Sequence, residues 1–167
     1  MYVFFDTEFS NLFADADLVS IGMVAQSGES FYAESNEVDM AFASEFVLEV
    51  VAPLLDAPAR FTLDEIGQQA TAWLAQFGSV TLLTDSPDYD WRFVQRIFRN
   101  VGWPANLRHH PGNLNAVMAP AVNQFFQNAV ERHQKALRVH HALDDALANL
   151  RAYQDTRLAK PTWRPKF

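Results

Sequence analysis

The alternation of apolar and polar positions predicts strands in the first part of the chain and mainly helices after them. Short apolar runs rich in β-branched and aromatic residues, bounded by polar or turn residues, are typical of buried strands. Four such runs are residues 2–8, 18–25, 31–33 and 80–83. The first three follow one another closely and predict an antiparallel meander, whereas the fourth leads into a helix and favours a parallel partner.

Longer segments with apolar residues at intervals of three and four predict helices. They are residues 43–51, 63–77, 88–101, 121–137 and 142–153. Thr62 and Glu65 form a capping-box pattern at the start of the second helix, and Pro53 is expected to stop the first. This order of elements predicts an α/β fold in which helices pack on a mixed sheet.

Two segments have weaker patterns. Residues 106–120 are rich in Asn, His, Gly and Pro and predict a loop, with a short strand at residues 106–108. Residues 154–167 contain two prolines and predict an irregular, basic tail.

Composition limits the class of protein. The 167 residues suffice for one domain with a layered core, and we expect a single domain, residues 1–167, without a linker. Neither a membrane span nor a signal peptide is evident, so a cytoplasmic location is expected. The chain has no cysteine. A bound metal would therefore need oxygen or imidazole ligands, which favours magnesium or manganese.

The net charge of −7 argues at first against a nucleic-acid partner, which normally meets a basic surface. Acids gathered at a metal site would weaken that argument. Two divalent ions on four carboxylates would leave a net charge of −3 instead of −7. The charge therefore does not exclude nucleic acid.

Two carboxylates leave the first predicted strand together. Asp6 and Glu8 are two residues apart and share a face of the strand, while Thr7 faces the other way. Like charges on one face are costly unless a cation neutralises them, which favours a metal site. The alternative is that the strand ends at Phe5 and that both acids are solvated.

Two further acids follow in patterned surroundings. Asp90 lies in an aromatic-Asp-x-x-Phe pattern, and Asp145 lies in the His-x-Ala-x-x-Asp-Ala pattern that begins at His140. With the Asp-x-Glu of the first strand, these motifs occur in the order found in DEDDh 3'-5' exonucleases. The chain resembles that family from Asp6 to Asp145, nearly its whole length.

The resemblance implies a fold and a set of site residues. The fold is the ribonuclease H-like one, with a mixed five-stranded sheet flanked by helices. Asp6, Glu8, Asp90 and Asp145 would bind two Mg²⁺ or Mn²⁺ ions, and His140 would be the general base, with Glu8 close to the attacking water. Two ions about 4 Å apart can activate a water and stabilise the leaving oxygen of a phosphodiester.

The implied activity is 3'-5' hydrolysis of single-stranded RNA ends, which releases nucleoside 5'-monophosphates. Within the superfamily the opening Phe-Phe-Asp-Thr-Glu-Phe is most similar to the RNase AS type of exoribonuclease, which acts on adenylate-rich 3' ends. Two alternatives stay open. One is a DNA exonuclease, because the metal mechanism does not distinguish ribose from deoxyribose. The other is a non-catalytic nucleic-acid-binding module on the same scaffold.

Helical spacing alone does not select His140. A separation of four would pair His141 with Asp145, or His140 with Asp144. The family pattern selects His140 with Asp145, which requires His140 to precede the regular helix. Asp144 is then expected to be a solvated acid or a helix cap, as are Asp85 and Asp88.

Several residues are candidates for substrate contacts. Phe9 next to Glu8 could stack on the terminal base or belong to the core, and Thr7 is a candidate beside it. Arg92 and Arg96 lie on one helix face and could bind phosphates or simply be solvated. The basic tail contains Tyr153, Trp163 and Phe167 among its cations at residues 151–166. It could bind single-stranded nucleic acid, or pack on the domain or a partner subunit, and a homodimer is expected because similar exonucleases often dimerise.

Overall fold

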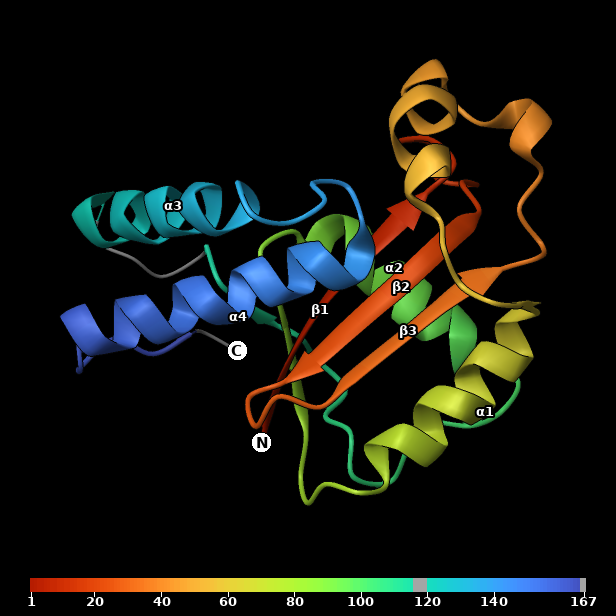
Figure 1. The fold of residues 1–167 in the computed structure, drawn as a ribbon. Coiled ribbons are helices and arrows are strands. Elements are labelled where there is room, and N and C mark those ends of the chain that lie inside the picture. Colours follow the sequence, from red (N-terminus) through yellow and green to blue (C-terminus); the bar gives the residue numbers. More distant parts are fainter. Residues whose placement is uncertain (116–119, 166–167) are drawn as a thin grey trace.

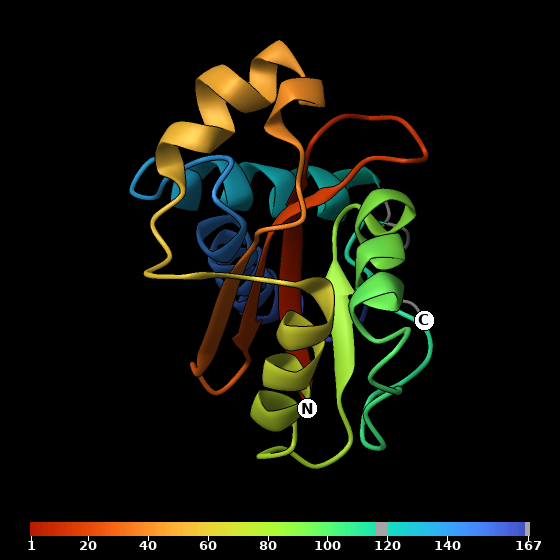
Figure 2. The same cartoon turned by 90° about the vertical axis from the view of Figure 1, so that its right-hand side faces the viewer.

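The computed structural model of the chain describes residues 1–115 and 120–165. A mixed sheet forms the middle layer, with α1 (Leu63–Leu74) and α2 (Pro87–Ile97) on one face and α3 (Pro120–Gln134) and α4 (Ala142–Ala159) on the other (Figures 1 and 2). This three-layer α/β arrangement agrees with the predicted fold class.

The sheet has six strands in the order β4-β3-β2-β1-β5-β6. Their bounds are β1 Tyr2–Phe9, β2 Leu18–Ala25, β3 Ser30–Ser35, β4 Arg60–Phe61, β5 Thr81–Thr84 and β6 Gly112–Asn113. The meander β1-β2-β3 is antiparallel, and the pairs β1-β5, β5-β6 and β3-β4 are parallel.

The sheet differs from the predicted five strands at its two edges. The strand expected at residues 106–108 is only a single bridge, between Leu107 and Val80, and β6 forms later. The two-residue β4 was not predicted. Segments of two residues carry no recognisable hydrophobic period, so only their pairing identifies them.

Four of the five predicted helices form, and the fifth is replaced by short turns. Thr62 and Glu65 form the predicted capping box at the start of α1. The segment expected to be one helix at residues 43–51 is instead three short turns, Met40–Phe42, Val47–Val51 and Ala52–Leu54. Ala43 is extended and interrupts the turns, and Pro53 lies inside the last of them rather than after it.

The C-terminal segment is more regular than predicted. Helix α4 continues through residues 154–159, because its inward face continues with the buried Tyr153 and Thr156 and the first proline comes only at residue 161. None of the helices in the described ranges is long and apolar enough to cross a membrane.

Two buried clusters hold the layers together. One joins the odd residues of β1, including Val3 and Phe5, to α1 and α2, and the other joins Phe4 to α3 and α4. Gly22 of β2 lets α4 approach closely, because a Cβ atom there would lie 2.3 Å from the backbone nitrogen of Leu143. The start of α4 is therefore packed directly on the sheet.

Candidate metal and active site

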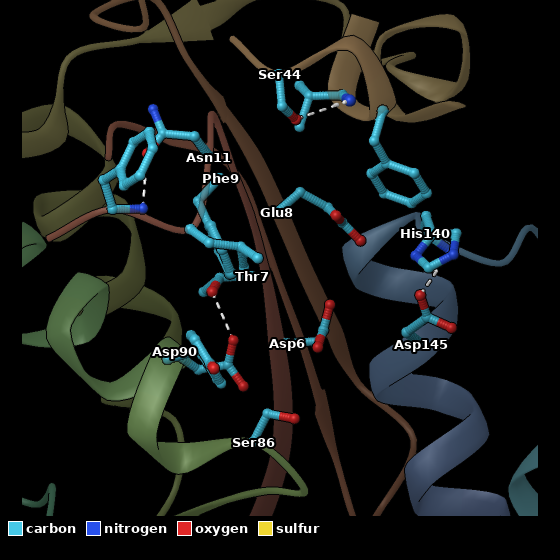
Figure 3. Close-up of a pocket in the computed structure, with 15 residues that line it drawn as sticks. Asp6, Thr7, Glu8, Phe9, Asn11, Ser44, Ser86, Asp90, His140 and Asp145 are labelled. Carbon is cyan, nitrogen blue, oxygen red and sulfur yellow. Dashed lines mark hydrogen bonds between the residues drawn. The ribbon is translucent and has the colours of Figure 1, made fainter. Parts of the chain in front are cut away.

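A pocket of about 750 Å³ opens where β1, α2 and the start of α4 meet (Figure 3). The motif residues that the sequence singled out all line it: Asp6, Glu8, Asp90, His140 and Asp145. They come from three segments separated by at least fifty residues in the chain. The fold therefore brings the predicted metal ligands and the predicted base to one place.

Strand β1 supplies two carboxylates and a threonine to opposite faces. Asp6 and Glu8 lie on the side of α4, and Thr7 lies on the side of α2, as the period of two in a strand requires. The Thr7 hydroxyl donates to Asp90 Oδ1 at 2.7 Å and is nearly buried. Thr7 therefore orients Asp90 and is not available as the predicted substrate contact.

Asp90 is fixed near the start of α2. Its second oxygen accepts a hydrogen bond of 2.5 Å from the hydroxyl of Thr84, the last residue of β5. Each carboxylate oxygen keeps a second lone pair, so the two hydroxyl bonds orient Asp90 without excluding a metal. Burial raises the pKa of the Asp90 carboxyl to about 7, although the two hydroxyl bonds act in the opposite direction.

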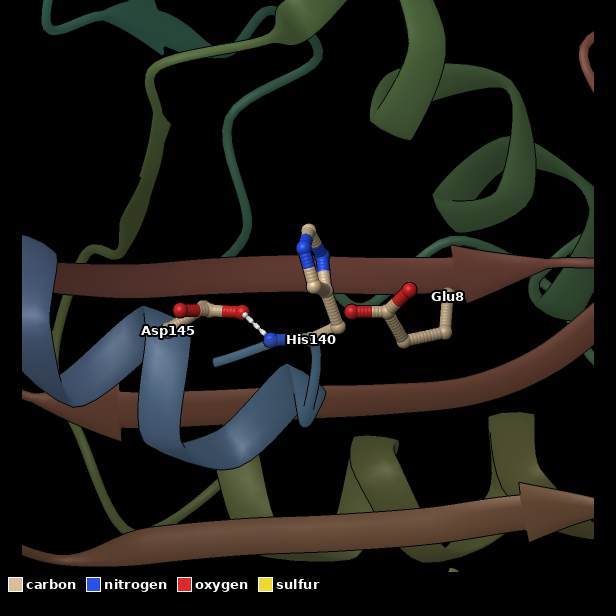
Figure 4. A group of neighbouring side chains, drawn as sticks. All are labelled: Glu8, His140 and Asp145. Carbon is tan, nitrogen blue, oxygen red and sulfur yellow. Dashed lines mark hydrogen bonds between the residues drawn. The ribbon is translucent and has the colours of Figure 1, made fainter. Parts of the chain in front are cut away.

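The turn before α4 presents His140 to the pocket. His140 has a φ of 67°, a left-handed conformation that is uncommon outside glycine, and its backbone N–H donates to Asp145 Oδ2 at 2.8 Å. Gln134 donates to the other oxygen of Asp145 at 2.8 Å. Figure 4 shows the imidazole of His140 between the carboxylates of Glu8 and Asp145.

The neighbouring histidine is turned away from this pocket. His141 is buried, stacks on Tyr32 at 4.5 Å between ring centroids, and contacts Asp56. Arg138 joins the same turn to its surroundings through bonds of 2.7 Å to Asp144 and 2.5 Å to Asp56. His141, Asp144 and Arg138 thus hold the turn, while His140 faces the pocket.

The pocket is strongly acidic. Burial, together with the nearby carboxylates of Asp145 and Asp90, raises the pKa of Glu8 to about 8. Burial and the surrounding carboxylates also hold the pKa of Asp6 well above its ordinary value. No lysine or arginine lines the pocket among the described residues. This donor set fits divalent cations, which would supply the missing positive charge.

The ligand atoms fall into two groups. One contains Glu8, His140 and Asp145, and the other contains Asp6, Asp85 and Asp90; within each group the atoms lie within 4.8 Å of one another. Asp85 was expected to be a solvated acid or a cap. It is instead half-buried at the end of β5, and burial raises its pKa. The motif comparison missed Asp85 because no family motif includes it.

The predicted arginine stripe has another role. Arg92 donates to the carbonyl of Phe13, and Arg96 donates to those of Ala14 and Ala16. The two guanidinium groups therefore hold the loop between β1 and β2 against α2. Their contact with substrate phosphates stays a prediction.

Phe9 lies at the edge of the pocket. Its ring stacks on Phe93 and Tyr89, with centroid distances of 5.2 and 6.3 Å. The sequence did not indicate Leu12, Phe13 or Phe46, which also line the pocket and are exposed. Isolated apolar residues in short turns carry no periodic signal, so these contacts appear only in the structure.

The tail does not present its aromatic residues to solvent. Tyr153 and Trp163 are buried against Phe126 and Phe4, and Arg157 donates to the carbonyls of Pro161 and Trp163. The prediction that these rings stack on nucleic acid is therefore wrong, and the alternative of a tail packed on the domain is confirmed. Lys166 and Phe167 lie outside the described residues.

Sequence comparison finds a partial match. No protein-family model matches the chain. Two curated proteins described as 3'-5' exoribonucleases, from Mycobacterium tuberculosis strains CDC 1551 / Oshkosh and ATCC 25618 / H37Rv, are each 42% identical to it over 59 residues. The match spans 35% of this chain and 35% of each relative. The alignment therefore covers about a third of each relative's length.

Structural comparison covers nearly the whole chain. A structure of exonuclease I aligns with a TM-score of 0.65 and 14% identity, over 96% of this chain and 41% of that one. The zinc-bound form of the Escherichia coli exonuclease I complex with single-stranded DNA aligns with a TM-score of 0.64, also at 14% identity.

The chain therefore has the ribonuclease H-like α/β fold of exonuclease I. Its local sequence is similar to that of proteins described as 3'-5' exoribonucleases. Both findings confirm the resemblance to 3'-5' exonucleases that the motifs predicted.

Proposed function

We propose that the protein is a metal-dependent 3'-5' exoribonuclease. It hydrolyses phosphodiester bonds at the 3' ends of single-stranded RNA and releases nucleoside 5'-monophosphates. The observation that carries the proposal is the convergence of Asp6, Glu8, Asp90 and Asp145 with His140 in one acidic pocket.

The chemistry follows from these residue types. Two Mg²⁺ ions, or Mn²⁺ in their place, held by the four carboxylates would supply a Lewis acid for the phosphodiester and its leaving 3'-oxygen. His140 accepts a proton from the attacking water through a ring nitrogen of the imidazole that lines the pocket. Glu8 lies within 4.8 Å of that ring, ligand atom to ligand atom, and orients the same water.

The other side of the pocket suits the terminal nucleoside. Phe46 stands edge-on to His140 at 4.9 Å between ring centroids, and Leu12 and Phe13 lie on the β1–β2 loop that borders the same pocket. Apolar and aromatic side chains accept any base by stacking. With Phe9 at the pocket edge, they would hold the terminal base and leave its phosphodiester at the carboxylates.

RNA is the preferred substrate class because the curated relatives are described as exoribonucleases. An adenylate-rich 3' end is the finer proposal, since the opening motif is most similar to the RNase AS type. Single-stranded DNA is the alternative substrate, and the exonuclease I complex with single-stranded DNA favours it. We further propose that the chain is one exonuclease domain that acts as a cytoplasmic homodimer.

Degradation of defined oligonucleotides tests the proposal. Purified protein with Mg²⁺ is expected to shorten single-stranded RNA from a free 3' end and to release 5'-monophosphates. A 3'-blocked RNA should be resistant. Asp6→Asn should reduce the rate by about a hundredfold to a thousandfold, because it removes a carboxylate that would hold the ions that stabilise the transition state.

Asp88→Asn is the matched control, because Asp88 is an exposed acid two residues before Asp90 and does not line the pocket. Cleavage of DNA but not RNA would favour the alternative substrate. Binding of RNA without turnover, in either Mg²⁺ or Mn²⁺, would rule out both enzymatic proposals and leave a nucleic-acid-binding module.

A further inference from the structure

A fifth carboxylate, Asp85, lies beside the proposed metal ligands. Strands β1 and β5 pair in parallel with Phe4 opposite Leu83, and the same register continued by two residues brings Asp85 level with Asp6. Phe4 and Leu83 both pack toward α3 and α4. Since side chains alternate with a period of two, Asp6 and Asp85 share that face. The topology of the sheet therefore places these two carboxylates side by side.

Asp90 completes the group from the side of α2. One oxygen from each of Asp6, Asp85 and Asp90 lies within 4.8 Å of the others. Among the described residues no lysine or arginine forms an ion pair with any of the three. Three carboxylates at this spacing repel one another unless a cation lies among them. An all-oxygen group of this kind suits a hard divalent ion.

A buried amide holds Asp85 in this position. Asn149 is only 3% exposed and follows Asp145 by one turn of α4, and its Nδ2 donates to Asp85 Oδ1 at 3.3 Å. Asn115 donates to the backbone carbonyl of Asp85 at 2.9 Å. Both the main chain and the side chain of Asp85 are thus anchored, which a solvated surface acid does not need.

Asn149 also has an unused acceptor. Its Oδ1 atom is buried and has no hydrogen-bond partner among the described residues. An unsatisfied buried oxygen is costly, whereas a water in the hydration shell of a nearby ion could donate to it. This unpartnered acceptor belongs to the buried amide that donates to Asp85, and the hydration shell of a cation at this end of β5 would supply a donor for it.

We propose that Asp85 is a ligand of the divalent ion held with Asp6 and Asp90, and that Asn149 is a positioning residue for the Asp85 carboxylate. The inference depends on the proposed metal-dependent function. It assigns this ion to the β1–β5 side of the pocket, and it assigns the second ion to Glu8 and Asp145.

Calorimetric titration with Mn²⁺, free of substrate, tests this assignment. The metal-free full chain is expected to bind two ions. Asp85→Asn, which keeps the shape of the side chain, should weaken one binding event by at least about tenfold and leave the other unchanged. Asn149→Ala should weaken the same event by about tenfold, since it removes only the group that orients the ligand.

Asp88→Asn again serves as the control, and far-UV circular dichroism with thermal unfolding verifies that each variant folds. Unchanged Mn²⁺ stoichiometry and affinity in Asp85→Asn would overturn the role of Asp85 and leave the proposed nuclease intact. Loss of both ions from a folded Asp85→Asn protein would overturn the assignment to one ion. A wild-type chain that binds no Mn²⁺ would overturn this inference together with the proposed function.

Discussion

At the scale of single residues, His140 combines a strained backbone with a position at the centre of the pocket. A non-glycine residue in the left-handed region costs on the order of 1 kcal/mol or more and persists where its surroundings enforce it. Here the bond from the His140 N–H to Asp145 enforces it, because Asp145 accepts through one oxygen and offers the rest of its carboxylate to the pocket. The position of the proposed base therefore depends on a hydrogen bond to a proposed metal ligand.

Replacing His140 by asparagine separates these two roles. Asparagine tolerates a positive φ better than most residues, so the turn and the backbone bond to Asp145 should persist in His140→Asn. The side chain can no longer take the proton of the water. We expect kcat to fall by about a hundredfold to ten-thousandfold, with a melting temperature close to that of the wild type.

The measurement is RNA hydrolysis at saturating Mg²⁺, with thermal unfolding alongside it. His110→Asn is the control, because His110 is exposed on a distant loop. A His140→Asn protein that keeps wild-type kcat would exclude His140 as the base, whereas one that unfolds early would show that the histidine mainly stabilises the turn.

Much of the site could be predicted from the sequence because its residues fall in short motifs with fixed strand or helix context. The shared face of Asp6 and Glu8 could be predicted from the period of a strand alone. His140 needed the family pattern, since helical spacing favours His141 and no local rule reveals a positive φ. Asp85 could not be found by motif at all, because its place depends on the register between two strands far apart in the sequence.

At the scale of elements, the contact between β2 and the start of α4 places the two halves of the site. Gly22 pairs with Asp6 across the sheet. A Cβ atom at position 22 would lie 2.3 Å from the Leu143 nitrogen and 2.4 Å from the carbonyl carbon of Ala142. Both atoms are backbone, so neither can rotate away.

Gly22→Ala should therefore displace the start of α4 from the sheet. We expect the free energy of unfolding to fall by about 1–3 kcal/mol, the usual cost of overpacking a core. Mn²⁺ affinity should fall as well, because Asp145 moves away from Asp6. Chemical denaturation and calorimetric titration measure the two effects.

Gly78→Ala is the control, since a Cβ atom at position 78 would meet nothing within 4 Å. That change should be neutral or slightly stabilising, because alanine restricts the unfolded chain. Equal stability of Gly22→Ala and Gly78→Ala would contradict the proposed contact.

The long elements were predictable because burial imposes a clear period on them. Residues 40–54 were not, since the extended backbone at Ala43 divides a segment that reads as helical, and the three resulting turns obey no single period. The end of α4 was also underestimated. The two prolines in residues 154–167 suggested an irregular tail, yet tertiary packing of Thr156 and Trp163 extends the ordered structure.

At the scale of the whole molecule, the net charge of −7 and the concentration of acids in one pocket link stability to pH and to metal. Some carboxyls have pKa values that are lowered by ion pairs, and they stop stabilising the folded state only in acid. They are Asp56, Asp144 and Asp155. The pocket carboxyls behave in the opposite way. The change in the free energy of unfolding between about pH 5 and pH 8 therefore reflects the pocket carboxyls.

Metal-free protein should lose stability as the pH rises through this range. In the folded state the pKa of Glu8 is about 8 and that of Asp90 about 7, against ordinary values of 4.5 and 3.8. Between these values the folded protein holds protons that the unfolded chain has released, so rising pH favours unfolding. Saturating Mg²⁺ should reverse the trend, because the ions bind the ionised carboxylates and stabilise only the folded state.

Thermal unfolding in EDTA and in Mg²⁺, at several pH values from about 5 to about 9, measures both slopes. In Glu8→Gln the slope in EDTA should be shallower, because one of the carboxyls with a raised pKa is gone. A metal-free melting temperature that rises across this range would contradict the argument, since it would mean that the pocket carboxyls are already ionised in the folded protein.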